Sequence, residues 1–462
     1  MSSTLAPSAP TIASAQASSK SKTDSWLLAG IFGLLFFGPL AFGATENWAI
    51  GVMEAVTILL FAFWVWSRPK SDEWQVRTHP LFNPMALFGA VVAIQIIFGW
   101  TAYRHDTFFQ ATLYLSYGLL VFLVVQTLRR SSQAKALAIA ISVYGVAVAS
   151  FSLLQGLSPN GKLYWIRASH GWIYGPYVSH NNYAGLMEML VPIPLVFCLT
   201  RFAVGQLRIV IAVGAALMAG TIFFSGSRGG MIAFVAEMIL FVALLKIQKG
   251  GKLATGAGIF ALVTLALLMW IGGVELTRRV ATIGTETKQE LSGGLRWTID
   301  KDGIRMFAHK PLLGWGLGTF PTAYPAFRSF YTTFFINDAH NDYLQVLVET
   351  GAAGFAAALW FLVLVYRQAF RKLADWPDDI NGAVSLACLL GVTGIVIHSF
   401  VDFNLQIPAN AAWFYVLCAV AASPYRLESR QRIRRTRSQP ARDEHSEPSP
   451  PETAEHGSTQ FT

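Results

Sequence analysis

The sequence is poor in charged residues and in cysteine. Charged residues make up 13% of the 462 residues, whereas a typical soluble domain carries about 25%. The three cysteines, Cys198, Cys388 and Cys418, all fall inside apolar runs. Neither a disulfide framework nor a thiolate zinc site is therefore expected. These shortages exclude an ordinary soluble domain and point away from redox chemistry.

Apolar residues are abundant instead. They form 53% of the chain, and the mean hydropathy is +0.45. A bilayer core needs about 20 mostly apolar residues per helix, so we expect an all-α, polytopic membrane protein with about twelve transmembrane helices. The predicted spans lie near 25–43, 46–66, 81–100, 110–127, 135–156, 184–205, 208–224, 229–248, 253–273, 343–366, 383–401 and 408–423.

The two ends of the chain differ from this apolar middle. Residues 1–24 are polar, and the first apolar run is long enough to span, so we interpret it as an uncleaved anchor rather than a removed signal peptide. Residues 425–462 are rich in Arg, Pro and Ser, which is typical of disorder. The expected organisation is a disordered N-terminus (1–24), a transmembrane domain (25–424) and a disordered tail (425–462).

Basic residues indicate how the helices are oriented. Lys and Arg are retained in cytoplasmic loops, and most of the 35 basic residues fall in inner segments if both termini are cytoplasmic. The outer basic residues are concentrated in the long segment 274–342, between spans nine and ten, which is long enough to escape this rule. The net charge of +9 therefore reflects topology, and no nucleic-acid partner is expected because no soluble basic domain is present.

Part of this outer segment, residues 292–320, predicts an amphipathic helix. Trp297, Ile304 and Phe307 recur with polar residues between them, and Pro311 with a Gly-rich loop ends the pattern. Such a helix can lie on the membrane surface with Arg296 and Arg305 facing the headgroups. The alternative is a basic helix that only anchors the segment.

The stretch FFSGSRGG, residues 223–230, places Arg228 in a tight outer turn. The glycines expose backbone N–H groups, and the following helix directs its N-terminal dipole at the same place. Arginine suits bidentate phosphate binding, so the turn has the form of an anion site. A snorkelling arginine that closes a hairpin is the alternative.

The stretch DAHNDYLQVLVETGAAG begins at Asp338 and enters the tenth span. Asp338 or Asn337 is expected to cap that helix, which leaves His340 in its first turn at the outer surface. A histidine there can act as a general base. Gly351 and Gly354 form a flat patch that lets another helix approach. Read alone, the histidine can equally be an interfacial hydrogen-bonding residue.

The outer loop 157–182 carries histidines, amides and aromatic residues. His170, His180, Asn181 and Asn182 lie there, and such side chains bind sugars, although aromatic residues also form interfacial belts. A metal site formed by His170, His180 and His340 is not expected, because their spacing is not that of metal ligands.

Ionisable residues inside the predicted spans are costly and mark candidate functional positions. His398 and Asp402 are four residues apart and are expected to share a helix face, as a proton relay or as a structural hydrogen-bonded pair. The full set is Glu54, Glu188, Glu237, Glu349, His398 and Asp402.

Over residues 180–420 the chain resembles the O-antigen ligase and polymerase superfamily of bacterial glycan transferases. The most specific shared motif is His-Asn, nine residues, then Gly-x-x-Gly, which His340, Asn341, Gly351 and Gly354 match. The SRGG turn and the PLLGWGLGTF segment, with Arg296 fifteen positions before its proline, are similar to the family pattern and occur in the same order.

The resemblance implies a glycosyltransferase-C-like fold in which residues 25–424 form a transferase domain. It implies metal-independent, inverting glycan transfer without a cofactor, from undecaprenyl diphosphate to an acceptor hydroxyl, on the periplasmic face of the bacterial inner membrane. By motif position, Arg228 and Arg296 hold the diphosphate and His340 activates the acceptor. The expected substrate-binding residues are Asn341, His180, Asn181 and Arg305.

The resemblance leaves the acceptor open. Ligases attach glycan to a lipopolysaccharide core, polymerases join repeat units, and related enzymes glycosylate protein hydroxyls. We expect the ligase type, with a lipid-linked glycan donor, a lipid-core or glycan acceptor, and the bilayer as partners. From other classes, a transporter or a structural partner in glycan export is the alternative, but no inverted repeat is visible and the motif residues gather at one surface.

Overall fold

The structure, a computed structural model, describes residues 12–68, 76–168, 172–249, 258, 293–333 and 335–424. These belong to the unit formed by residues 1–427. The described part is mostly helical, with one short antiparallel hairpin, β1 (Lys162–Leu163) and β2 (Arg167–Ala168), in which Lys162 lies opposite Ala168. The expected all-α class is confirmed.

The helices follow the apolar runs. They are α1 (Ile12–Leu40), α2 (Asn47–Trp66), α3 (Phe82–Ile97), α4 (Arg104–Thr127), α5 (Ser131–Leu157), α6 (His180–Leu190), α7 (Pro192–Leu199), α8 (Gly205–Ser225), α9 (Arg228–Lys249), α11 (Gly293–His309), α12 (Phe320–Ala323), α13 (Asp342–Phe370), α14 (Ile380–His398) and α15 (Pro408–Ala421). Short 3-10 turns are η1 (Phe42–Ala44), η3 (Tyr324–Ala326) and η4 (Asn404–Gln406).

Nine helical stretches among the described residues are long and apolar enough to cross a membrane, and α3 and α15 are shorter apolar helices. The expected span 184–205 is observed as α6 followed by α7, because Pro192 starts a new helix. The expected span 253–273 lies outside the described residues except for position 258. The count of twelve is therefore not confirmed.

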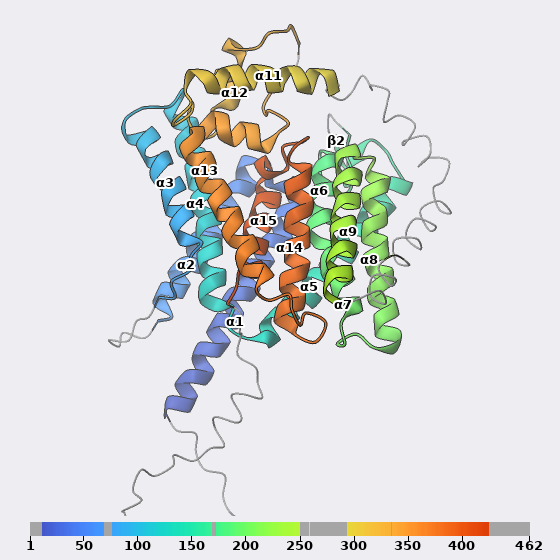
Figure 1. Ribbon diagram of the computed structural model, residues 1–462. Helices are drawn as coiled ribbons and strands as arrows, with labels where there is room; N and C mark the ends of the chain where they lie inside the picture. The colour runs from blue at the N-terminus through green and yellow to red at the C-terminus, as the bar shows by residue number, and fades with distance from the viewer. Residues whose placement is uncertain are drawn as a thin grey trace, which may run out of the picture. The chain divides into compact units, whose positions relative to one another are not determined.

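Helices α14 and α15 lie between two groups of helices (Figure 1). On one side are α3, α4 and α13, where α13 packs on α3 and α15 packs on α4. On the other side are α6, α8 and α9, and α14 packs against both α6 and α9. In its most apolar stretch α14 is 89% buried, against 28% for α2. The central helices thus form the core, and the outer ones expose apolar residues as lipid-facing helices do.

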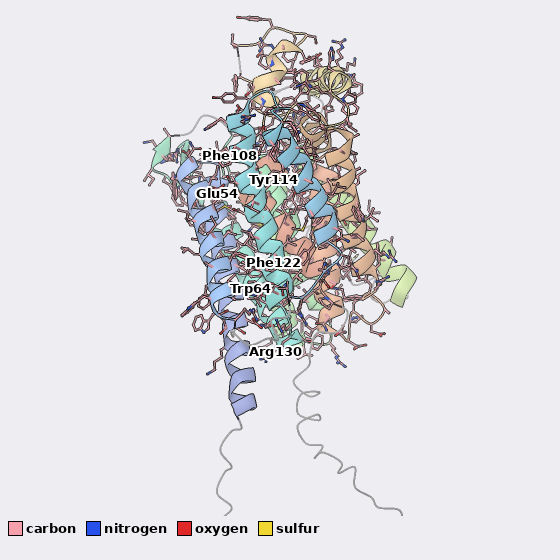
Figure 2. All side chains as sticks on the ribbon, turned by 90° about the vertical axis from the view of Figure 1, so that its left-hand side faces the viewer. Glu54, Trp64, Phe108, Tyr114, Phe122 and Arg130 are labelled. Carbon is pink, nitrogen blue, oxygen red and sulfur yellow. The ribbon has the colours of Figure 1, made fainter. Side chains whose placement is uncertain are left out.

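Helices α2 and α4 run alongside each other (Figure 2). Thr112 Oγ1 donates a hydrogen bond to Glu54 Oε1 at 2.8 Å. The rings of Trp64 and Phe122 meet edge to face with centroids 5.0 Å apart. Glu54, a candidate functional position by sequence, therefore has a structural partner in the neighbouring helix.

Ion pairs gather several of the basic loops at one end of the bundle. Asp24 is buried between Arg68 and Arg129, each 3.1 Å away, so the start of the first span meets the ends of α2 and α4. Arg201 lies 3.8 Å from Asp378, which joins two more of these loops. The grouping agrees with the expected alternation of inner and outer segments, whereas its direction in the membrane stays a prediction.

Candidate active site

His340 lies just before α13 rather than inside it. Asn341 caps the helix, and its side chain accepts a hydrogen bond from Leu344 N at 3.2 Å. The expected cap at Asn337 or Asp338 is therefore wrong, because the chain turns into the helix later. His340 takes a φ of +57°, in the left-handed region where non-glycine residues are uncommon. Such strained residues concentrate at functional sites.

The imidazole of His340 is turned toward Asp402. His340 Nδ1 lies 3.7 Å from Asp402 Oδ1, which is longer than a hydrogen bond. The side chain of Asp402 is 2% exposed and that of His340 is 15% exposed. Phe403 packs edge to face on the His340 ring with centroids 4.8 Å apart. The ring is thus held while part of it stays accessible.

Arg296, on α11, reaches the same loop. Its Nη1 donates to the carbonyl of Val401 at 2.7 Å and lies 3.9 Å from Asp402 Oδ2. Burial alone would raise the pKa of Asp402, but the neighbouring His340 and Arg296 hold that pKa well below its ordinary value. The loop therefore presents an ionised carboxylate between an imidazole and a guanidinium.

His398 does not pair with Asp402 as the sequence suggested. Helix α14 ends at His398, and Asp402 lies in the turn that follows, so the two do not share a helix face. His398 Nδ1 instead lies 3.0 Å from Glu188 Oε1 on α6, and both side chains are fully buried. Glu237 of α9 is also fully buried and close enough to Glu188 to interact electrostatically. Spacing along one helix could not reveal this pairing between helices.

Arg228, expected in the turn, is the first residue of α9, and Gly226 ends α8 with a φ of +79°. The next glycines allow close packing. A Cβ at Gly229 would lie 2.7 Å from His398 Nε2 and 2.9 Å from Val401 Cγ2. The N-terminus of α9 therefore lies against the segment that joins α14 to Asp402. Packing at Gly229 therefore places the start of α9, of which Arg228 is the first residue, beside the loop that Arg296 contacts.

The Gly-x-x-Gly motif receives a loop rather than the expected neighbouring helix. Gly351 has a φ of +66° inside α13, and a Cβ there would clash with the backbone of Leu312 and Leu313. Gly316 N donates to the carbonyl of Glu349 at 2.9 Å. The Glu349 carboxylate accepts from Gly318 N at 2.8 Å. The motif thus fixes the Gly-rich loop that follows α11 onto the helix that follows His340.

Asp342 is a residue of the site that the sequence did not single out. Its Oδ2 accepts from Ser399 Oγ at 2.8 Å and from Leu405 N at 3.1 Å, while Oδ1 accepts from Gln406 Nε2 at 3.1 Å. These bonds hold both ends of the loop that carries Asp402. An acidic residue in the first turn of a helix is common, so its sequence position alone does not signal this role.

Arg305 lies away from His340's partners. It is nine residues after Arg296, half a turn out of phase, and its side chain is 65% exposed and 3.3 Å from Asp302. The expected apolar face is also wrong in part. Trp297 and Ile304 are exposed, and the buried face of α11 instead contains Ile299 and Met306.

The remaining predicted residues lie at the start of α6. His180 is buried, and its ring packs on Trp172 with centroids 4.6 Å apart. Asn181 is half-buried beside it. His170 lies outside the described residues. Within the part of the chain that the structure describes, no group of three His, Cys, Asp or Glu residues is arranged to hold a metal ion.

Fold and site together define a multi-pass helical membrane protein with a cluster of arginine, histidine and aspartate at one end of its bundle. Residues 213–359 match the family model described as O-antigen ligase, which confirms the resemblance to that superfamily. Arg228, Arg296 and His340 fall inside the matched range, whereas Asp402 lies beyond it. A search of the curated proteins gives no match.

Proposed function

We propose that the protein transfers a glycan from an undecaprenyl-diphosphate carrier to an acceptor hydroxyl. The observation that carries this proposal is the convergence of Arg296 and His340 on Asp402, with the N-terminus of α9 against the adjacent Val401. Two guanidinium groups and a helix N-terminus suit a diphosphate. A partly accessible imidazole beside them suits proton abstraction.

The proposed reaction is a single displacement. The acceptor oxygen gives its proton to His340 and forms a bond to the anomeric carbon from the face opposite the diphosphate. The bond from that carbon to the diphosphate oxygen breaks, and the diphosphate leaves with the electron pair. Arg228 and Arg296 stabilise the charge that develops on the leaving group. Asp402 stabilises the imidazolium, and no step requires a metal ion.

The proposed setting is the bacterial inner membrane with both termini in the cytoplasm. The basic loops that meet around Asp24 then face the cytoplasm. His340 and α11 then face the periplasm, where lipid-linked glycans are used. For the acceptor we propose the lipopolysaccharide core, as in ligases.

The first experiment compares the native protein with His340→Ala and His105→Ala. His105 is the matched control, because its side chain is 75% exposed and it lies in the first turn of α4. The nearby Ala102 N donates to the carbonyl of Trp315, so this turn is close to the loop that follows α11. Purified proteins receive an undecaprenyl-diphosphate-linked glycan and core-lipid acceptor, and release of undecaprenyl diphosphate is followed. We expect release by the native and His105→Ala proteins and a loss of about 10²-fold or more in His340→Ala. Full activity in His340→Ala contradicts the proposal.

A further inference from the structure

An apolar cavity of about 690 Å³ lies among α3, α4, α13 and α15. Its volume is within the range of about 300–1,000 Å³ that is usual for ligand pockets. Aromatic side chains are prominent in its lining, including Tyr114 and Phe122, which lie along α4 (Figure 2). Because α4 and α13 are among the apolar helices long enough to span, the cavity lies at the depth of the lipid tails.

One end of this cavity is polar and belongs to the candidate site. Asp342, Ser399 and Gln406 line it, and these are residues that hold the loop carrying Asp402. The cavity therefore ends directly behind the loop that faces His340. A molecule with an apolar chain in the cavity has its polar end next to the reacting groups.

The arginine side of the site lies across this loop from the cavity. Gly229 at the start of α9 faces His398 and Val401, whereas Ser399 and Leu405 face the cavity. The described residues of α6, α8 and α9 contribute nothing to the cavity lining. If the diphosphate binds beside the N-terminus of α9, where Arg228 lies, the cavity lies on the other side of the loop that carries Asp402.

We infer that the cavity binds the hydrocarbon chain of a lipid-anchored acceptor. This inference rests on the proposed function, in which the acceptor attacks from the face opposite the leaving diphosphate. The acceptor must then approach from the side away from the arginines, which is the cavity side. A chain that leaves the bilayer for an apolar cavity gains little from the hydrophobic effect, since both surroundings are apolar. The cavity therefore serves to orient the acceptor hydroxyl.

Gly89 is a position of the cavity lining at which a side chain can be introduced. It lines the cavity from α3, and a Cβ at Gly89 would have no other atom within 4 Å. Gly51 on α2 is equally open but is not part of the lining. Gly89→Phe and Gly51→Phe are thus a matched pair, each introducing one phenyl ring into an exposed helical position.

The test uses two acceptors, a short oligosaccharide attached to a hydrocarbon chain and the same oligosaccharide without it. In Gly89→Phe we expect kcat/KM to fall about tenfold or more for the chain-bearing acceptor. The kcat/KM for the free oligosaccharide and the KM for the donor should not change. Gly51→Phe should match the native protein. A raised donor KM would assign the cavity to the donor chain, and no change at all would assign it to ordinary bilayer lipid. Either result overturns the inference.

A binding measurement separates this inference from the proposed function. The chain-bearing oligosaccharide, with a diazirine in its chain, is photo-crosslinked to the native, His340→Ala and Gly89→Phe proteins. We expect labelled peptides from α3 and α4 in the native and His340→Ala proteins and not in Gly89→Phe. Unlabelled probe should reduce this labelling, whereas excess phospholipid should not. If the native protein shows no transfer, the proposed function fails. The cavity assignment then fails only if labelling is absent or is reduced by phospholipid.

Discussion

Asp402 sets the charge of the candidate site at the scale of single residues. It is 3.7 Å from His340 and 3.9 Å from Arg296, and it is almost fully buried. A buried carboxylate is costly unless it is paired, and here the Arg296 guanidinium and the neighbouring His340 ring supply the pairing. Its lowered pKa means that it stays ionised whenever the protein is near neutral pH. The sequence marked Asp402 as a candidate but paired it with His398, whereas its neighbour in the structure is His340.

Asp402→Asn removes the carboxylate charge but keeps a side chain of the same size. It should therefore impair transfer. Because His340 becomes positive when it accepts a proton, loss of the neighbouring charge should lower the rate by about 10²-fold. Asp106→Asn is the control, since Asp106 also lies beside a histidine, His105, but its side chain is 31% exposed rather than 2%. Release of the carrier diphosphate measures both, and equal rates in the two variants would rule out a special role for Asp402.

The lowered pKa of Asp402 also predicts how its stabilising effect depends on pH. A carboxylate whose pKa is lower in the folded state stabilises that state at pH values above its unfolded pKa, about 3.9 for Asp. That contribution disappears as the pH falls toward the lowered value. The melting temperature of Asp402→Asn should thus lie below that of the native protein at pH 7, and the difference should shrink below about pH 4. A constant difference down to pH 3 would contradict this assignment.

At the scale of elements, α11 decides which arginine joins the site. The sequence predicted an amphipathic helix there, and a helix is present, but its buried face is different from the one expected. Ile299 and Met306 are buried together with apolar residues of α12 and α13, so Arg296 is turned toward Val401 and Arg305 toward solvent. The contacts that rotate a helix come from residues distant in the chain, and a local hydrophobic pattern does not contain them.

This rotation can be tested with two conservative changes on one helix. Lysine keeps the charge of arginine but lacks the planar donors that bind phosphate in a bidentate manner. Arg296→Lys should raise the KM for the diphosphate-linked donor about tenfold, the equivalent of about 1.4 kcal/mol. Arg305→Lys should leave it within twofold. Steady-state kinetics at varied donor concentration distinguish the two variants. Equal changes in the donor KM would contradict the prediction that Arg296, and not Arg305, belongs to the site.

At the scale of the whole molecule, ion pairs and polar anchors hold distant helices together at both ends of the bundle. Asp24, inside α1, joins that helix to the ends of α2 and α4 at one end, while Asp342 and Glu349 fix loops at the other. A buried ion pair such as that of Asp24 is expensive to break when one partner is removed. Exposed pairs contribute much less, as is expected for Glu46 and Arg167.

Asp24→Asn should therefore destabilise the protein far more than Glu46→Gln. The first change leaves Arg68 and Arg129 without their shared carboxylate and should cost about 3–5 kcal/mol. The second breaks an ion pair whose side chains are 44% and 40% exposed, and should cost at most about 1 kcal/mol. Thermal melting in detergent at pH 7 measures which of the two variants loses more stability relative to the native protein. A similar small shift for both would show that the Asp24 cluster does not hold the helix ends.

The sequence by itself determined the membrane class and most of the helices, and its resemblance to a known family predicted Arg228, Arg296 and His340 as site positions. These depend on local features, since hydrophobic length is set by the bilayer and the motifs are short. Only the tertiary structure decided that Asp402 pairs with His340, which lies 62 residues away, and that His398 pairs with Glu188. It also decided the anchoring roles of Asp342 and Glu349. Such pairings depend on how helices distant in the chain pack together, and no periodicity within one helix encodes them.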